Sequence, residues 1–501
     1  MPNMAEHILA IDQGTTSTRA IIFDSSATPI ASAQTELTQY FPRRGWVEHD
    51  PNEIAESAIG VSEQAISRAG VTPNDIAAIG IANQRETTIV WERATGRPLA
   101  NAIVWQDRRT ANTCADIAQS SHARDIRQTT GLVIDAYFSA TKLSWLLDAV
   151  PNGRKRAKSG ELCFGTVDSW LLWRLTGGTV HAIDSTNASR TMLLNLHDLQ
   201  WDPGMMELFD IPPVMLPEIK ASAGDFGVTN KPIFGAEIPI TAMAGDQHAA
   251  LYGQACFKNG QVKCTYGTGA FVLTNRGTIP PLESSERGGL LATLGFQVGS
   301  KRCYAVEGSV FSTGATIQWL RDGLGIISSA AETSEMASLA ESHHGVYFVP
   351  AFVGLGAPYW APHATASITG MTRATTKYDI VRAALESTAY QVADVITAMG
   401  NGRRKSREPL RADGGQSANS FAMQFQADIL DRPVEVAKVV ETTARGAALL
   451  AGRGIGLWRS EKEINSLWQA SARYEPSITE SERMNLRSGW SAAIERSSSI
   501  T

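Results

Sequence analysis

Residues 7–23 read HILAIDQGTTSTRAIIF, and this stretch decides the class of fold. The apolar run at residues 8–11 predicts a buried strand, and residues 19–23 predict a second strand directly after a polar turn. Between them the carboxylate of Asp12 is followed by Gly14 and a run of hydroxyl side chains. Glycine lets a backbone approach phosphate oxygens closely, and hydroxyl and amide groups donate to them. The segment therefore predicts either a phosphate-binding turn or a hydroxyl-rich hairpin turn without a ligand.

A similar turn recurs half a chain later. Residues 265–271 read TYGTGAF and, like residues 11–17, they place glycine and threonine between two strand-like runs. One such turn in each half predicts two domains of related design that face each other. Glycine and asparagine at residues 253–260 punctuate the chain between these turns. The expected domains are residues 1–255 and residues 256–501.

Strand-like and helical segments alternate along the chain, which is typical of α/β proteins. Apolar runs bounded by turn residues predict strands, and apolar residues at helical spacing predict long helices. The expected strands are residues 8–11, 19–23, 79–83 and 88–91, and the expected helices are residues 51–69, 142–149, 378–399 and 419–430.

The composition fits an ordinary globular protein, with 43% apolar and 19% charged residues in a chain of 501. The net charge of −5 gives no basic footprint for nucleic acid. No apolar run is long enough to cross a bilayer, so we expect no membrane span. Five cysteines without a CxxC pair, at positions 114, 163, 256, 264 and 303, predict buried reduced thiols and a cytoplasmic protein.

A second acidic position, Asp246, follows the strand-like residues 238–243 in the run Ala-Gly-Asp-Gln-His. A carboxylate at the end of a strand suits a catalytic base at the edge of a sheet. Because residues 247–251 have a helical pattern, a helix-capping aspartate is the alternative interpretation.

A third polar segment, residues 410–419, reads LRADGGQSAN and predicts a strand, an Asp-Gly-Gly turn and a helix. This order offers N–H groups and a helix dipole to an anion or nucleotide, although a plain strand–helix connection has the same pattern. The sequence contains no GxxxxGK[ST], no HExxH and no GxGxxG after a strand, which excludes the common nucleotide and zinc motifs. Residues 452–456 (GRGIG) predict a helix end rather than a nucleotide loop.

Taken in order, these motifs resemble the FGGY family of carbohydrate kinases, whose members have an actin-like ATPase fold. The resemblance implies an α/β protein with two actin-like (ribonuclease-H-like) ATPase domains that face a central cleft. The N-terminal domain would bind the acceptor and phosphate, and the C-terminal domain would bind the nucleotide. The resemblance runs from about residue 8 to residue 490, and its most specific segments are residues 83–88 (NQRETT), 102–106 (AIVWQ), 131–135 (GLVID), 137–139 (YFS), 265–271 (TYGTGAF) and 354–360 (GLGAPYW).

Within the family, these segments are most similar to those of members that phosphorylate glycerol. The resemblance then implies glycerol as acceptor, ATP as phosphoryl donor, Mg²⁺ as cofactor, and a homo-oligomer, either a dimer or a tetramer. Charged and amide groups would pair with the hydroxyls, and aromatic rings would cover the C–H face. The positions that match the glycerol contacts are Arg85, Glu86, Trp105, Tyr137, Asp246, Gln247 and Phe271.

Arg85 and Glu86 are neighbours, so in a regular strand their side chains would face opposite sides. Both can reach one ligand only if the strand ends or bends there. Without the resemblance, the two residues predict an ion pair on the surface.

The resemblance also assigns the nucleotide contacts and the chemistry. The expected reaction is in-line transfer in which Asp246 accepts the proton of the attacking hydroxyl. Asp12 matches the carboxylate associated with Mg²⁺, and Asp246 is expected to lie near the same ion. The nucleotide positions are Thr15, Thr16, Ser17 and Arg19 in the first half and Thr268, Gly314, Gln318, Gly415 and Asn419 in the second.

Two other functions compete with this interpretation. The nearer alternative is a kinase of the same family that acts on another polyol or on a ketose. The other is a non-catalytic actin-like ATPase that uses nucleotide as a conformational switch, which would have no need for Arg85, Glu86 and Asp246 beside the phosphates.

Residues 229–237 bear on regulation and read TNKPIFGAE. Some bacterial relatives are inhibited by fructose 1,6-bisphosphate at a Gly-Gly-Lys-Gly-Gly-Thr-Arg-like version of this loop. Others are activated when a phosphotransferase carrier phosphorylates a histidine there. The present loop has one glycine, no arginine and a glutamate that would repel an anion, and proline replaces the histidine. We therefore expect an enzyme that is insensitive to both controls.

Overall fold

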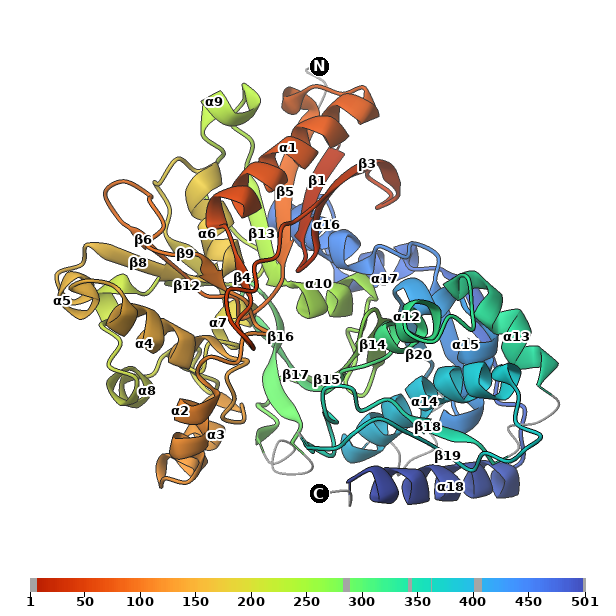
Figure 1. Cartoon of the computed structure of the whole chain (residues 1–501). Coiled ribbons are helices and arrows are strands. Elements are labelled where there is room, and N and C mark those ends of the chain that lie inside the picture. The colour runs from red at the N-terminus through yellow and green to blue at the C-terminus, as the bar shows by residue number, and fades with distance from the viewer. Residues whose placement is uncertain (1–6, 283–288, 341–344, 362, 401–407, 499–501) are drawn as a thin grey trace.

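The computed structural model describes residues 7–282, 289–340, 345–361, 363–400 and 408–498. Two large sheets with helices on both sides confirm the α/β class, and each half of the chain builds one of them (Figure 1). The described chain begins in the first sheet, and it ends with a helix at the opposite end of the molecule.

The first sheet has five strands in the order β3-β2-β1-β5-β13. β1, β2 and β3 pair antiparallel, whereas β1, β5 and β13 pair parallel. The carboxyl ends of the three parallel strands therefore meet at one edge of the sheet. The bounds are β1 His7–Gln13, β2 Ser17–Phe23, β3 Pro29–Glu36, β5 Ile76–Asn83 and β13 Ile240–Gly245.

The second sheet has seven strands in the order β16-β17-β15-β14-β20-β21-β22. β14, β15 and β17 pair antiparallel, whereas β14, β20 and β21 pair parallel, which repeats the pattern of the first sheet. The turns β1–β2 and β14–β15 are thus equivalent, as the recurring Gly/Thr pattern predicted. The bounds are β14 Val262–Tyr266, β15 Ala270–Gly277, β16 Leu291–Val298, β17 Lys301–Val310, β20 Leu410–Asp413, β21 Val434–Ala437 and β22 Ala470–Tyr474.

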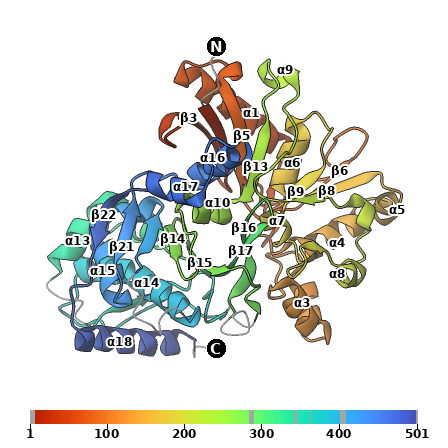
Figure 2. The same ribbon diagram turned by 180° about the vertical axis from the view of Figure 1, so that it is seen from behind.

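Helices cover both faces of the first sheet because β1 is apolar on both sides. Leu9 and Ile11 lie in the core that includes α1 (Pro51–Ala69), and Ile8 and Ala10 lie in a second core with α16 (Thr442–Gly454). α16 comes from the second half of the chain, yet it packs on β1, β5 and β13 (Figure 2). This helix therefore packs one half of the chain against the other.

Most of the segment between β5 and β13 forms a lobe beside the first sheet (Figure 1). It supplies the loops that carry Trp105 and Tyr137. Its elements include β6 Ile89–Glu92, β7 Ala102–Ile103, α2 Ala111–Ala118, α3 His122–Thr130, α4 Ser139–Ala149, α5 Gly153–Lys158, β8 Leu162–Gly165, α6 Val167–Leu175, β9 Ala182–Asp184, α7 Ser185–Ala188, β10 Leu194–Asn195, β11 Gln200–Trp201, α8 Pro203–Leu208, β12 Glu218–Lys220 and α9 Lys231–Phe234.

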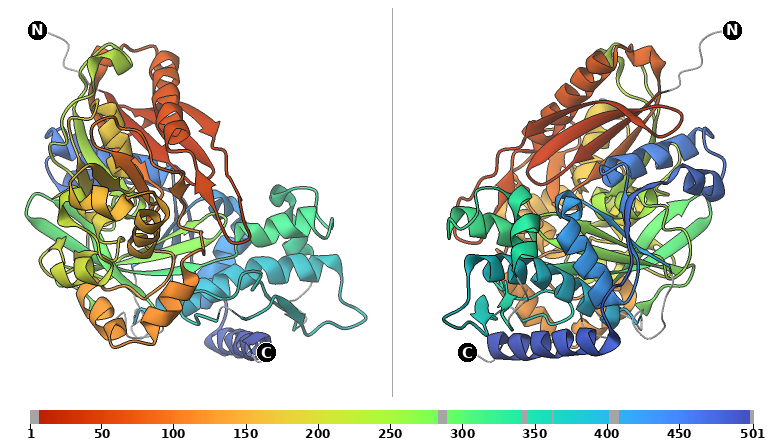
Figure 3. Two further views of the ribbon diagram at one scale, coloured as in Figure 1. Left: turned by 60° about the vertical axis from the view of Figure 1, so that its left-hand side comes forward. Right: turned by 90° about the vertical axis from the view of Figure 1, so that its right-hand side faces the viewer.

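Most other helices of the second half lie around the second sheet, and the last helix of the chain lies across the end of the molecule (Figure 3). The predicted helices are present, with small shifts at their ends: 51–69 is α1, 142–149 begins earlier as α4, 378–399 is α14 and 419–430 is α15. The principal bounds are α10 Asp246–Gly253, α12 Gly314–Asp322, α13 Thr333–Leu339, α14 Lys377–Ala398, α15 Ser420–Leu430, α17 Glu461–Leu467 and α18 Glu480–Ser498.

All five cysteines are buried free thiols, as predicted. Of the helices in the described part of the chain, none has the length and apolar character needed to cross a membrane.

Candidate active site

Arg85 and Glu86 follow β5, which ends at Asn83. Glu86 has a φ of 62°, in the left-handed region, so the chain leaves the strand geometry where the two side chains begin. Both residues are buried, with 3% and 1% of their surfaces exposed. The strand therefore ends where a common ligand requires it to, and the surface ion pair expected from the two residues alone is not formed.

Asp246 and Gln247 open α10 directly after β13. Because Gly245 pairs with Asn83 in the parallel register, this helix start lies beside the end of β5. The Nε of Arg85 lies 3.0 Å from Oδ1 of Asp246, and the amide of Gln247 donates to the other carboxylate oxygen at 3.1 Å. The helix-capping position belongs to Gly245, so Asp246 is the first residue of the helix and 29% of its side chain is exposed.

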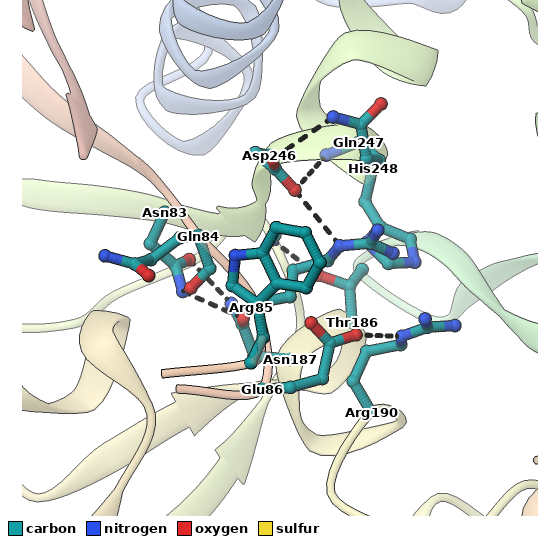
Figure 4. Close-up of polar contacts among 12 residues, drawn as sticks. Asn83, Gln84, Arg85, Glu86, Thr186, Asn187, Arg190, Asp246, Gln247 and His248 are labelled. Carbon is teal, nitrogen blue, oxygen red and sulfur yellow. Dashed lines mark hydrogen bonds and ion pairs between the residues drawn. The ribbon is translucent and has the colours of Figure 1, made fainter. Parts of the chain in front are cut away.

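Two further charged residues, Glu307 and Arg190, complete a network of ion pairs, and Figure 4 shows the contacts of Arg190 with Glu86 and of Arg85 with Asp246. The carboxylate of Glu307, on β17, accepts from the Nη1 of Arg85 at 2.5 Å and from its Nη2 at 3.0 Å. Arg190, after α7, donates to Glu307 at 3.2 Å and to Glu86 at 2.6 Å. The signs of charge alternate along the series Asp246, Arg85, Glu307, Arg190 and Glu86.

Aromatic rings border this network. The rings of Trp105 and Tyr137 meet edge to face with centroids 5.4 Å apart. The guanidinium of Arg190 lies 5.7 Å from the ring centre of Tyr137, and that of Arg85 lies 5.9 Å from the ring centre of Phe271. The structure thus connects all seven predicted acceptor residues through direct contacts or through Glu307 and Arg190. Such a set can pair hydroxyl groups with charges while rings cover carbon atoms.

The first hydroxyl turn lies between β1 and β2 and contains Thr15 and Thr16, with Ser17 starting β2. The indole Nε1 of Trp105 donates to Thr15 Oγ1 at 2.9 Å, which joins this turn to the aromatic wall. Arg19 follows the turn on β2, where its Nε donates to Gln34 at 3.0 Å and its guanidinium pairs with Glu441. It lies opposite Asp12 in the β1–β2 register, and its charge opposes the rise in the pKa of that carboxylate.

The second turn lies between β14 and β15 and contains Thr268. It packs tightly against α12, because a Cβ on Gly314 would lie 2.6 Å from the carbonyl oxygen of Gly267. It also packs against the turn after β20, where a Cβ on Gly414 would lie 2.5 Å from the carbonyl oxygen of Tyr266. Glycine at these positions lets the backbones of the β14–β15 turn, the start of α12 and the turn after β20 come into contact.

The remaining predicted nucleotide positions surround these backbones. Gly415 starts the short helix after the Gly414 turn, and Asn419 caps α15 by accepting from the N–H of Ala422 at 3.0 Å. Gln318 lies one turn after Gly314 on α12 and is exposed. The structure therefore gathers Thr268, Gly314 and Gly415 around one turn, with Asn419 and Gln318 on the adjoining helices.

Burial and charge shift the pKa values of the acidic groups in different directions. Burial, with the nearby carboxylates of Asp246 and Glu441, raises the pKa of Asp12 to about 7. Burial also raises the pKa of Glu86. Although burial opposes it, the guanidinium groups of Arg190 and Arg85 hold the pKa of Glu307 well below its usual range.

Sequence reasoning missed Arg190, Glu307 and Lys263. Lys263, on β14, is buried and donates to Gln247 at 2.5 Å and to Thr265 at 2.8 Å. For Lys263 and Glu307, the one signal in the sequence is a charged residue inside a mainly apolar strand. Their partners are distant along the chain, so no local pattern identifies their role.

Known proteins that are similar to this chain show its family. The sequence profiles of the FGGY family of carbohydrate kinases match residues 7–253 (N-terminal domain) and 262–455 (C-terminal domain). Glycerol kinase 2 of Thermotoga maritima is 55% identical over 98% of this chain and 99% of its own length, and the glycerol kinase of Deinococcus radiodurans is 51% identical over 98% of each. The crystal structure of Plasmodium falciparum glycerol kinase with ADP superposes with a TM-score of 0.91, at 37% identity over 98% of each chain. These matches extend over almost the whole chain, and the protein belongs to the FGGY family of carbohydrate kinases.

Proposed function

We propose that the protein is a glycerol kinase, which transfers the γ-phosphoryl group of ATP to a terminal hydroxyl of glycerol and yields sn-glycerol 3-phosphate. Relatives named glycerol kinase are 50–55% identical to it over nearly its whole length. The structural observation that supports the proposal most is the contact of the buried Arg85 with the partly exposed Asp246, beside Glu86 and the rings of Trp105 and Tyr137.

The acceptor would bind where these side chains meet. Arg85, Glu86 and Gln247 offer partners for hydroxyl groups, and Trp105, Tyr137 and Phe271 offer ring faces for the carbon chain. Buried polar partners discriminate strongly, because a ligand without the matching hydroxyl leaves them unpaired. A longer ketose would need the space that the rings of Trp105 and Tyr137 occupy, which favours a three-carbon acceptor.

The nucleotide phosphates would lie between the two Gly/Thr turns. The backbone N–H and hydroxyl groups of these turns can donate to phosphate oxygens as negative charge moves during transfer. The proposed contacts in the first half are Thr15, Thr16, Ser17 and Arg19, and in the second half Thr268, Gly314, Gln318, Gly415 and Asn419.

The carboxylate of Asp12 fits a divalent cation. No donor in the described ranges hydrogen-bonds this carboxylate, and it faces the like charges of Asp246 and Glu441. The described residues contain no group of three or more His, Cys, Asp and Glu that could hold a metal, so Asp12 and Asp246 would share the ion with water and phosphate. Bound Mg²⁺ would neutralise charge on the β- and γ-phosphates.

In the transfer step, Asp246 accepts the proton from the acceptor hydroxyl. The hydroxyl oxygen forms a bond to the γ-phosphorus while the bond from that phosphorus to the bridging oxygen of ADP breaks. The contact with Arg85 and the N–H of Gln247, which donates to Oδ1 at 2.7 Å, hold the Asp246 carboxylate in one orientation. Positioning and electrostatics supply most of the acceleration in such reactions.

A coupled assay for ADP release tests the proposal with ATP and a panel of glycerol, erythritol, D-xylulose, D-ribulose and D-gluconate. We expect glycerol to give the highest kcat/KM. A far higher activity on a pentulose or gluconate would overturn the choice of substrate, and no activity on any acceptor would favour a nucleotide-dependent switch.

Arg85→Ala and Glu86→Ala test the acceptor site in the same assay. Each leaves a desolvated partner unpaired at a cost of roughly 1–3 kcal/mol, so kcat/KM for glycerol falls while ATP binding persists. The cytoplasmic location and the dimer or tetramer stay predictions, and sedimentation velocity on the purified protein tests the assembly.

A further inference from the structure

We infer that Glu307, on the second sheet, is a positioning residue for acceptor binding: it holds Arg85 directly and Glu86 through Arg190. This inference rests on the proposed function of Arg85 and Glu86, and assigns a role to two residues of the same site. It also implies that the acceptor site is assembled from both halves of the chain.

The position of Glu307 on β17 lets it reach across to the first half. It pairs with Leu273 of β15, and Phe271 of β15 pairs with Ser309 two residues further along β17. Because residues two apart in a strand face the same side, Glu307 and Phe271 lie on one face of the sheet, and both approach Arg85. The second sheet thus supplies one charge and one ring around this guanidinium.

The bonding pattern assigns each nitrogen of Arg85 a separate partner. Nη1 and Nη2 donate to the two carboxylate oxygens of Glu307, which leaves Nε for Asp246. This two-point contact fixes the plane of the guanidinium, because the fork of nitrogens matches a carboxylate. The orientation of Arg85 toward an acceptor therefore depends on Glu307.

Arg190 carries the same constraint to Glu86. It donates from Nη2 to Glu307 and from Nε to Glu86, and all three side chains are at most 1% exposed. One oxygen of Glu86 is held in this way, and its other oxygen has no hydrogen-bond donor in the described part of the chain. That second oxygen is available to a hydroxyl of the acceptor.

Loss of the Glu307 charge changes the whole network. The buried guanidinium groups of Arg85 and Arg190 would lose the carboxylate that both contact. Breaking a buried charged pair in this way leaves an uncompensated charge. Arg85 and Arg190 would then turn toward Asp246 and Glu86, the remaining carboxylates. Both acceptor-binding side chains lose their orientation, while the Gly/Thr turns keep their contacts.

Glu307→Gln removes the charge and keeps the size of the side chain, and Glu386→Gln is its matched control. Glu386 on α14 is also a carboxylate with 1% side-chain exposure, paired with Arg382 at 2.7 Å, and it touches no proposed site residue. We expect Glu307→Gln to raise KM for glycerol by roughly tenfold to a hundredfold, with KM for ATP unchanged. Glu386→Gln should leave both KM values unchanged.

A binding measurement separates positioning from stability. Glycerol should raise Tm of the unmodified protein and of Glu386→Gln, because a ligand that binds only the folded state stabilises it. The rise should be lost in Glu307→Gln. If that variant fails to fold, Arg190→Lys keeps the charge but cannot span Glu307 and Glu86 with two nitrogens, and it should raise the same KM.

Two results would overturn the inference. One is a Glu307→Gln enzyme with an unchanged KM for the acceptor and an unchanged Tm response. The other is an equal loss of acceptor and ATP affinity in Glu307→Gln, which would indicate general disruption. Failure of the proposed function gives a different result from failure of this inference, because the unmodified enzyme would then prefer another acceptor. In that case the KM for that acceptor is compared between the unmodified enzyme and Glu307→Gln.

Discussion

The indole Nε1 of Trp105 lies 2.9 Å from the hydroxyl oxygen of Thr15. Trp105 belongs to the proposed acceptor site, and Thr15 belongs to the proposed phosphate turn. One hydrogen bond therefore connects the two substrates' sites, and it crosses 90 residues of sequence. An acceptor that displaces Trp105 would also remove the hydrogen-bond donor of Thr15 in the proposed phosphate turn.

The first prediction concerns this bond. Trp105→Phe keeps most of the ring surface but removes the donor, and Thr15→Val removes the acceptor. The loss of a neutral hydrogen bond costs about 0.5–1.5 kcal/mol, so each variant should lower kcat/KM for glycerol at least a few-fold. In the double variant the losses should be less than additive, because both changes remove one interaction. Fully additive losses would show that the bond does not link the sites.

The second prediction concerns Asp246→Asn, which retains the shape of the side chain but cannot accept a proton. We expect kcat for glycerol to fall by on the order of 10²–10⁴, the usual contribution of a general base. ATP affinity, measured by calorimetry, should change little. Asp116→Asn, an exposed aspartate on α2, is the control and should keep full activity. Turnover by Asp246→Asn near the unmodified rate would remove Asp246 from its proposed role.

The sequence predicted most of the central fold because its strong signals are local. Residues 8–11 and 19–23 are apolar runs on either side of a turn, and they form β1 and β2. The helix predicted at 51–69 has both its N-cap, Asp50, and its C-cap, Gly70, in the sequence, and its bounds match α1. Local propensity and tertiary burial agree in these segments. The helix was predicted with its correct ends, whereas both strands extend further into the turn than the predicted residues 8–11 and 19–23.

The charged network could not be predicted in the same way. Arg190 is separated by 104 residues from Glu86, and Glu307 by 222 residues from Arg85. No periodic pattern relates positions this distant. The turn at Glu86 also has no local signal, because glutamate rarely adopts a positive φ. It is held by the ion pair with Arg190 and by the hydroxyl groups of Thr88 and Ser139, which donate to the Glu86 carbonyl.

The third prediction concerns the contact between α10 and α16, which joins the halves of the chain. A Cβ on Gly446 would lie 1.8 Å from the carbonyl oxygen of Ala249, so Gly446→Ala must push the helices apart. Overpacking costs about 1–3 kcal/mol, and we expect a lower Tm. Gly60→Ala is the matched control, since Gly60 lies within α1 with no atom within 4 Å of the added Cβ. That change should raise stability by roughly 0.5–1 kcal/mol. Equal effects of both substitutions would contradict the packing argument.

The fourth prediction concerns regulation. In residues 229–237 the structure forms the short helix α9, Lys231–Phe234, which ends at Gly235 with a φ of 75°. Pro232 provides no phosphoryl acceptor, and exposed Glu237 would repel a sugar bisphosphate. Fructose 1,6-bisphosphate in the kinase assay, and incubation with a phosphotransferase carrier system, should both leave the rate unchanged. Strong inhibition or activation would mean that another site serves this purpose.

The last prediction concerns pH and the buried pair Asp168, on α6, and Asp184, at the end of β9. Burial, followed by the charge of Asp184, raises the pKa of Asp168 to about 7. In the unfolded chain an aspartate titrates near about 4. Between these values the folded protein binds more protons than the unfolded chain, so the free energy of unfolding decreases as the pH rises. Asp168→Asn cannot ionise, and it should flatten this slope in urea titrations at several pH values. Asp116→Asn, the exposed control, should keep the slope of the unmodified protein. An unchanged slope in Asp168→Asn would show that Asp168 is already ionised in the folded protein below neutral pH.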